Sequence, residues 1–242
     1  MSLNFFRTLQ EKPWLQPDAV LPERVMDRSD INPKKLPLIV FLGIVSVFFF
    51  LFLITFLARS QYPDFQALAG ETWQPFYHPQ QLWINTGLLL IACVALQVAL
   101  MATRRQNIHT AQIALCLALL FTLQFGAAQL LLWRHLYKLG FYMASNPANS
   151  YFYLLTALHG LHLIGGLFVL VPVILRSFGF FRPATTAPQQ RPLQPPRQQQ
   201  LQYSLELCAL YWHYLFVIWL LIFFFNASSP AVYKTLAALC GY

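Results

Sequence analysis

The chain has 242 residues, of which 57% are hydrophobic and 10% charged, and its formal net charge is +8 at pH 7. This composition excludes an ordinary soluble domain, because one core of this size cannot bury so much apolar surface, and it favours an integral membrane protein. The basic residues are not interleaved with aromatic residues as in a nucleic-acid-binding groove, so we expect no nucleic-acid partner.

Five apolar segments are long enough to cross the hydrocarbon core of a bilayer, which takes about 20 residues as a helix. The segments are 37–58, 83–103, 111–133, 151–175 and 205–226. The strands of a β-barrel would be shorter and would alternate in polarity, which these segments do not. The predicted fold class is therefore an all-α, multi-pass integral membrane protein with five transmembrane helices.

The segments outside the spans differ in character. Residues 1–36 carry no apolar core of a signal peptide and form a predicted cytoplasmic tail, and residues 37–242 form the predicted transmembrane domain. Residues 60–82 mix aromatic residues with prolines, which predicts an ordered segment at the membrane interface. Residues 177–202 are rich in Pro and Gln, which predicts a flexible linker between the fourth and fifth spans.

The distribution of Lys and Arg predicts the orientation of the chain. The N-terminal tail and the loops after the second and fourth spans together hold 12 of these residues, whereas the other side of the membrane holds 4. Basic residues of short loops stay on the cytoplasmic side. We therefore expect a cytoplasmic N-terminus and a periplasmic C-terminus in a bacterial inner membrane.

Ionisable residues are scarce within the spans. Of the eight acidic residues only Glu206 belongs to a span, at its predicted cytoplasmic start. Proton and cation carriers keep ionisable groups at bilayer depth. The pattern therefore disfavours a stand-alone pump or secondary transporter, although a carrier that uses His and backbone carbonyls stays open.

Three histidines lie within the last two spans, at His159, His162 and His213. One interpretation is a metal or haem site, because neutral imidazole is a common ligand. The interpretation that we favour is that they are neutral residues at helix contacts and hydrogen-bond across them, as buried polar side chains of membrane helices do. The chain has no H-E-x-x-H motif and no pair of histidines spaced for two haems, so we expect it to bind no metal or haem.

Small residues predict where the helices approach each other closely. Gly160, Gly165 and Gly166, with Ala157 a turn earlier, indicate a smooth contact strip on the fourth span. Residues 126–128, Gly-Ala-Ala, indicate a second strip on the third span. Small residues allow the backbones of membrane helices to come close together.

Two specific segments carry a resemblance to a known family. FYLLTALHGLHLIGGLFVL (152–170), then ILRSFGFF, and later ELCALYWHYLFVIWLLIFF (206–224) closely resemble the last two helices of cytochrome c oxidase subunit III. The family pattern runs F-x-x-T-G-x-H-G-x-H-V-x-x-G, then an Arg with aromatics, then E-x-x-x-L-Y-W-H-F-V-D-x-V-W. LWINTGLLL (82–90) is similar to its L-N-T-L-L-L-L, and five spans suit the shorter members of the family.

The residues of this chain fit the family's motifs only in part. Three family carboxylates are replaced here, by Val45 in the first span, Leu132 in the third and Phe216 in the fifth. The chain therefore resembles a divergent member of the family. The positions that do match are Asn85, Thr86, Gln129, His159, His162, Arg176, Glu206, Tyr211, Trp212, His213 and Trp219.

The resemblance implies an accessory subunit without a catalytic site of its own. Such a subunit acts in aerobic respiration beside subunit I and subunit II of a haem-copper oxidase, and the haem and copper are expected in the catalytic subunit. Its helices would form a V-shaped bundle that binds phospholipid and supports oxygen reduction and proton uptake by the catalytic subunit. Arg176 would bind phospholipid. The polar helix-packing residues would be Asn85, Gln129, His159, His162, Glu206 and His213.

Other functions remain open at the level of the sequence. Accessory subunits of quinol oxidases and nitric oxide reductases resemble the same motifs. A small transporter or a cytochrome-b-like carrier belongs to another class, and haem absorbance or substrate uptake by the chain expressed alone would reveal it.

Overall fold

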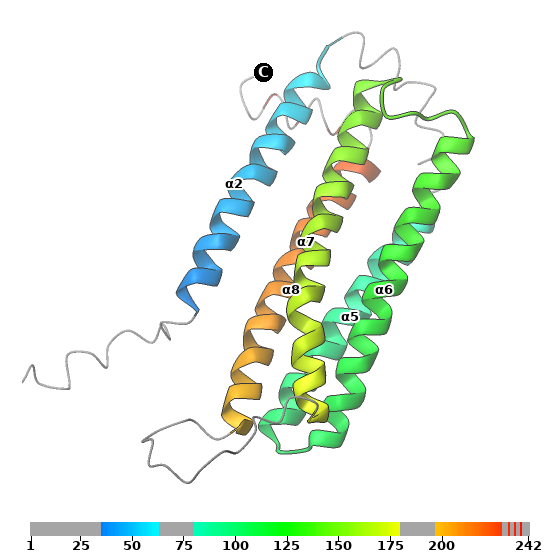
Figure 1. Ribbon diagram of the computed structural model, residues 1–242. Coiled ribbons are helices and arrows are strands. Elements are labelled where there is room, and N and C mark those ends of the chain that lie inside the picture. Colours follow the sequence, from blue (N-terminus) through cyan, green and yellow to red (C-terminus); the bar gives the residue numbers. More distant parts are fainter. Residues whose placement is uncertain are drawn as a thin grey trace, which may run out of the picture. The chain divides into compact units, whose positions relative to one another are not determined.

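The described part of the structure consists mainly of helices joined by short turns. The computed structural model of the chain describes residues 35–62, 80–179 and 197–228, with Val232, Thr235 and Ala238. The helices are α2 (Leu36–Arg59), α5 (Gln80–Arg104), α6 (Ile108–Lys138), α7 (Pro147–Phe178) and α8 (Arg197–Ala227) (Figure 1). Each is long and apolar enough to cross a membrane. The prediction of an all-α membrane protein with five spanning helices is confirmed.

The chain divides into two units. The first, Met1–Ile39, is described only from residue 35, one residue before α2 begins, and the second is Val40–Tyr242. All contacts discussed below lie within the second unit. The predicted tail up to residue 34, residues 63–79 of the predicted interfacial segment and residues 180–196 of the predicted linker lie outside the described residues.

The helices extend beyond the predicted spans because their end turns are polar or capped. Asn146 precedes α7 and its side chain accepts a hydrogen bond from the backbone N–H of Ala148 at 2.9 Å. At the other end of α7, Gly179 has φ +85°, a conformation that glycine adopts without steric cost. Hydropathy reports only the part of a helix within the hydrocarbon. Residues 177–178 and 197–202 were predicted in the linker but are helical.

α5 and α6 form a hairpin whose seam consists of small residues. Asn107 caps α6 by accepting a hydrogen bond from Thr110 N–H at 3.2 Å, after Gln106 has turned the chain with φ +61°. Alanines of both helices are buried in the same cluster, which allows close backbone contact. These alanines are Ala95, Ala99, Ala114 and Ala118. This alanine seam was not predicted from the sequence, where the close contacts were expected mainly at glycines.

Three tryptophans join the helices through threonine hydroxyls. Trp212 and Trp219 are fully buried on α8, and their indole N–H groups donate to Thr122 of α6 at 3.2 Å and to Thr86 of α5 at 3.0 Å. Trp133 of α6 donates in the same way to Thr156 of α7 at 3.3 Å.

The chemistry of both partners explains this repeated pairing. Each of the three threonine hydroxyls donates its proton to the backbone carbonyl four residues earlier, at 2.7 or 2.8 Å. The hydroxyl oxygen can then only accept, and an indole N–H can only donate. The pairs therefore satisfy both groups within the helix bundle, where no bulk water reaches.

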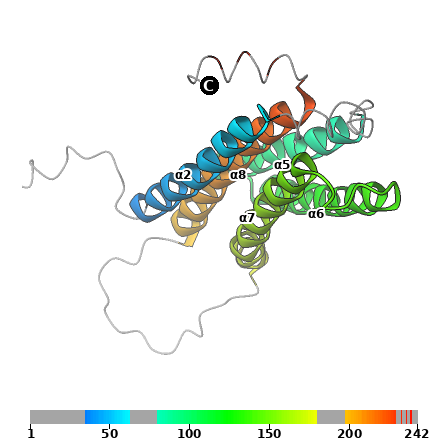
Figure 2. The ribbon, with the colours of Figure 1, turned by 90° about the horizontal axis from the view of Figure 1, so that it is seen from above.

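From Val40 onward, α2 packs on α7 and α8. Val45, Phe49 and Leu53 of α2 belong to a buried cluster with Leu155 of α7 and with Ile218 and Ile222 of α8. The hydroxyl groups of Ser46 and Tyr214 lie 3.0 Å apart in the same contact. Seen from above, α2 and α8 lie beside each other, consistent with this cluster (Figure 2).

The contact of α7 with α8 depends on Gly166 and not on a strip of glycines. A methyl group on Gly166 would lie 2.7 Å from Tyr211 Cε1 and 2.9 Å from two ring carbons of Trp212. A methyl group on Gly165 would lie 3.9 Å from the hydroxyl oxygen of Tyr211, which is an ordinary contact distance. On Gly160 or Gly126 it would meet no atom within 4 Å. The predicted strips are therefore wrong for Gly160 and Gly126, which meet no other helix, whereas Gly165 lies at the edge of the contact with Tyr211.

We predict that Gly166→Ala destabilises the packing of α7 on α8. The added methyl group forces the two rings to move, and overpacking of this kind costs about 1–3 kcal/mol. Gly165→Ala is the matched control, since it has the same effect on helix propensity without the clash. The measurement is the thermal unfolding of the purified protein, and equal midpoints for both variants would contradict the contact.

A second prediction concerns the indole of Trp219. Thr86→Val keeps the side-chain shape but removes the acceptor, so a buried N–H is left unsatisfied at a cost of about 1–3 kcal/mol. Thr103→Val is the control, because Thr103 is also buried on α5 and bonds the carbonyl of Ala99, at 2.9 Å. Thr86→Val should lower the unfolding midpoint more than Thr103→Val, and the reverse order would refute the role of the pair.

Candidate functional site

The polar interior of the bundle begins with an amide pair between α5 and α6. Asn85 Nδ2 donates to Gln129 Oε1 at 2.8 Å. Both side chains are buried, Asn85 completely. Asn85 precedes Thr86, the acceptor of Trp219, so one turn of α5 contacts both α6 and α8. The two predicted packing residues therefore hydrogen-bond each other across a helix contact, without charge.

His159 lies in an aromatic enclosure on α7. Its side chain is fully buried, and its ring centroid lies 5.9 Å from that of Phe125 of α6 and 5.3 Å from that of Trp219 of α8. Neither ring nitrogen has a hydrogen-bond partner among the described residues. His159 therefore occupies the junction of α6, α7 and α8 through ring contacts alone.

The other two histidines bond to their own helices. His162 Nδ1 lies 2.7 Å from the carbonyl oxygen of Leu158, and His213 Nδ1 lies 2.6 Å from that of Ala209. A helical side chain leans back over the preceding turn, which brings the ring nitrogen to the carbonyl four residues earlier. The prediction that the imidazoles hydrogen-bond across a helix contact is therefore wrong for the bonds that the structure describes.

A tyrosine makes the cross-helix bond in place of the imidazole. The hydroxyl group of Tyr211 on α8 donates to the backbone carbonyl of His162 at 2.8 Å. The half-buried ring of His162 instead faces α2, where its centroid lies 6.4 Å from that of Phe41 and 5.6 Å from that of Phe49. His213 is exposed on the surface of the chain.

Glu206 and Arg176 lie near the ends of the apolar spans of α8 and α7. The Oε1 atom of Glu206, near the start of α8, accepts a hydrogen bond from Nη2 of Arg104 at the end of α5, at 3.0 Å. The Arg104 side chain is 53% exposed, so the pair contributes no more than about 1 kcal/mol to stability. Arg176 is an exposed residue in the last turn of α7.

The positions of the three replaced carboxylates are apolar contacts. Val45 lies in the cluster that joins α2 to α7 and α8. Leu132 is buried with Phe125 and Trp219, and Phe216 packs half-buried against the same cluster. Each substitution therefore matches its surroundings, since a carboxylate buried among these groups would lack a partner.

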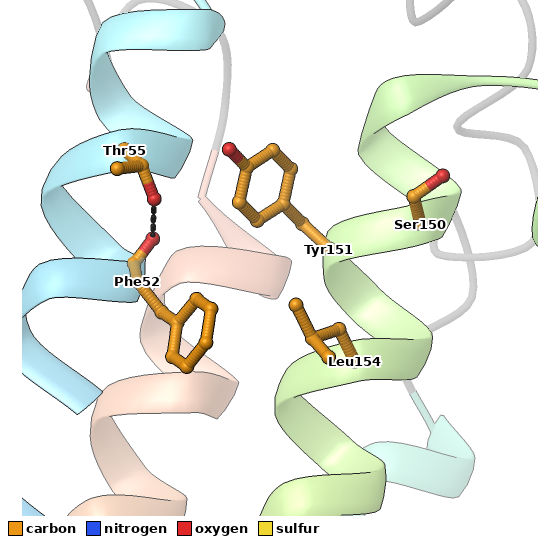
Figure 3. A pocket seen from close by; sticks show the side chains of 5 residues that line it. All are labelled: Phe52, Thr55, Ser150, Tyr151 and Leu154. Atoms are coloured by element: carbon orange, nitrogen blue, oxygen red, sulfur yellow. Dashed lines mark hydrogen bonds between the residues drawn. The ribbon is translucent and has the colours of Figure 1, made fainter. Parts of the chain in front are cut away.

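An open cavity of about 220 Å³ lies between α2 and α7 (Figure 3). It is lined by Phe52 and Thr55 of α2 and by Ser150, Tyr151 and Leu154 of α7. The hydroxyl group of Thr55 donates to the carbonyl of Phe52 at 3.0 Å, which leaves mainly carbon atoms facing the cavity. The lining of this cavity is therefore mainly apolar.

A cationic face lies at the end of α6. Arg134, His135 and Lys138, with Leu131, line a shallow cavity of about 300 Å³ on one side of this helix. Of these residues, Arg134 and Lys138 entered the prediction of the orientation of the chain, and none was predicted as part of a site. Within the described ranges no group of three His, Cys, Asp or Glu side chains could hold a metal ion.

Comparison with known proteins places these features in a family. Residues 31–227 match the family of cytochrome c oxidase subunit III. A probable cytochrome c oxidase subunit 3 of Nocardia farcinica is 26% identical over 214 residues, which cover 86% of this chain and 93% of that protein.

Two further relatives cover smaller shares of both chains. The cytochrome bo(3) ubiquinol oxidase subunit 3 of Buchnera aphidicola is 27% identical over 157 residues, 64% of this chain and 73% of that one. The cytochrome c oxidase subunit 3 of Osphranter robustus is 28% identical over 187 residues, 73% of this chain and 62% of that one.

The match extends over most of the chain and includes all five helices, which are long and apolar enough to span a membrane. The chain therefore belongs to the cytochrome c oxidase subunit III family, as a multi-pass membrane subunit of a haem-copper oxidase complex.

Proposed function

We propose that this chain is the non-catalytic accessory subunit III of a cytochrome c oxidase in a bacterial inner membrane. It stands beside subunit I, the catalytic subunit that holds the haem and copper, and beside subunit II, and it binds no metal or haem itself. The observation that carries this proposal is the family match over residues 31–227. The relative from Nocardia farcinica, which is named as a probable cytochrome c oxidase subunit, agrees with it.

The neutral interior of the bundle supports an accessory role. The buried polar side chains of the described residues are amides, hydroxyl groups and the imidazole of His159, with no carboxylate among them. Proton carriers keep acidic or basic groups at bilayer depth as a relay. In this proposal the chain supports proton uptake by holding the catalytic subunit and its lipids in place, and does not pass protons through its own helices.

Lipid binding is the second part of the proposal. The cavity beside Tyr151 takes an acyl chain between α2 and α7, and Arg176 binds the phosphate of an anionic headgroup at the other end of α7. A guanidinium group pairs with phosphate oxygens through two parallel N–H donors. Residues 151 and 176 are separated by about 37 Å along a helix that rises 1.5 Å per residue. The two positions therefore belong to different lipids, one in each leaflet.

An accessory subunit of a quinol oxidase is the alternative. The relative from Buchnera aphidicola, named as a ubiquinol oxidase subunit, favours it. The two functions place this chain in the same position beside a haem-copper subunit and differ in the electron donor of the complex.

We expect the tagged chain to copurify with a haem-copper subunit from membranes solubilised in mild detergent. Mass spectrometry identifies the partners, and oxygen consumption with reduced cytochrome c or with quinol identifies the donor. Activity with quinol alone would replace the first proposal by the alternative. Recovery of the chain without any haem-containing partner would contradict both.

Arg176→Ala should lower the amount of anionic phospholipid that remains with the purified complex. The variant removes the guanidinium group and leaves the apolar part of α7 unchanged. Arg105→Ala is the control, because Arg105 is also an exposed arginine on the side of the membrane predicted to be cytoplasmic. Mass spectrometry of extracted lipid measures both, and equal lipid content in wild type and Arg176→Ala would show that Arg176 determines orientation alone.

A further inference from the structure

Four buried polar atoms on α5, α6 and α7 have no hydrogen-bond partner in the described part of the chain. They are Oδ1 of Asn85, Nε2 of Gln129 and both ring nitrogens of His159. The three side chains come from α5, α6 and α7. All are more than nine-tenths buried, at 0%, 6% and 0% exposure. An unsatisfied buried polar group costs about 1–3 kcal/mol, so a partner for these atoms is expected.

We propose that this polar layer, Asn85, Gln129 and His159, binds ordered internal water. Water fits because each part of the layer lacks both a donor and an acceptor, and a water molecule supplies both. Buried waters in proteins typically make about three hydrogen bonds to groups of this kind. The proposal does not depend on the identity of the electron donor or on lipid binding.

The amide pair defines the first water position. Asn85 and Gln129 are joined by a single hydrogen bond, which uses the amino group of one amide and the carbonyl oxygen of the other. One carbonyl oxygen and one amino group remain, whichever way the two amides are turned. A water molecule that donates to Oδ1 of Asn85 and accepts from Nε2 of Gln129 would give each of these two atoms a hydrogen-bond partner.

His159 defines the second water position. A neutral imidazole has one donor and one acceptor nitrogen. The neighbouring ring of Trp219 cannot supply the missing donor, because its only N–H group is bonded to Thr86. Thr156, one turn earlier on α7, donates its proton to the carbonyl of Phe152. The hydroxyl and indole donors around His159 are therefore already used, and water remains as the partner.

Other occupants fit the layer less well. A metal ion would need several anionic or imidazole ligands, and no such group of three exists in the described ranges. An apolar ligand would leave all four atoms unsatisfied. A protonated His159 would need a carboxylate, and none lies among the buried side chains that the structure describes.

The test is a density map of the intact oxidase complex at a resolution that shows ordered water. We expect one peak within hydrogen-bond distance, about 2.7–3.2 Å, of both Asn85 Oδ1 and Gln129 Nε2. A second peak should lie at the same distance from a ring nitrogen of His159. Absence of both peaks in a map that shows other buried waters would overturn the proposal, as would a direct bond from a protein side chain to each atom.

His159→Phe separates the two positions. The variant keeps an aromatic ring between Phe125 and Trp219 but removes both nitrogens, so the second peak should disappear while the first remains. Persistence of the second peak would show that His159 does not hold that water. If the variant complex does not assemble, the wild-type map still decides between water and no water at both positions.

Discussion

The bundle is organised by the need of each buried indole N–H to find an acceptor where bulk water is absent. Trp212 and Trp219 project from α8 to α6 and α5, and Trp133 projects from α6 to α7. Each indole finds a threonine hydroxyl whose proton is already used by its own helix. Because an indole N–H can only donate, these pairs fix which turns of neighbouring helices face each other. The alanine seam and Gly166 then allow the backbones to approach closely enough for the pairs to form.

A neutral interior follows from the same constraint. Unpaired charge is costly within hydrocarbon, and the bundle joins its helices with amides, hydroxyl groups and indoles instead. Val45, Leu132 and Phe216, the positions at which the resemblance predicts carboxylates, agree with this chemistry, since each of these residues packs in an apolar cluster. The ion pair joins Arg104, in the last turn of α5, to Glu206, at the start of the apolar span of α8. An interior of this kind stabilises a fixed arrangement of helices, as an accessory subunit requires.

The two kinds of polar residue in the spans have different consequences. The threonines and the tryptophans satisfy one another, so they hold the bundle without any further partner. The polar layer of Asn85, Gln129 and His159 contains more hydrogen-bonding atoms than its members can satisfy among themselves. The unsatisfied atoms distinguish the polar layer, for which we propose bound water, from the threonine–tryptophan pairs, which need no further hydrogen-bond partner. His162 and His213 differ from His159 in this respect, because their Nδ1 atoms bond to carbonyl groups of their own helices.

The sequence alone determined the class of the fold, the five spanning helices and the family, because long apolar segments and the motifs around His159 and Trp212 are local features of the chain. It did not determine which helices meet or which small residues lie in the contacts. Gly165 and Gly166 are adjacent, yet only at Gly166 does α8 leave no room for a side chain, and the imidazoles expected to bond across a contact bond along their own helices. The physical reason is that lipid tails are as apolar as leucine side chains. Hydropathy therefore shows that a residue avoids water, and only the tertiary structure shows whether it faces lipid or another helix.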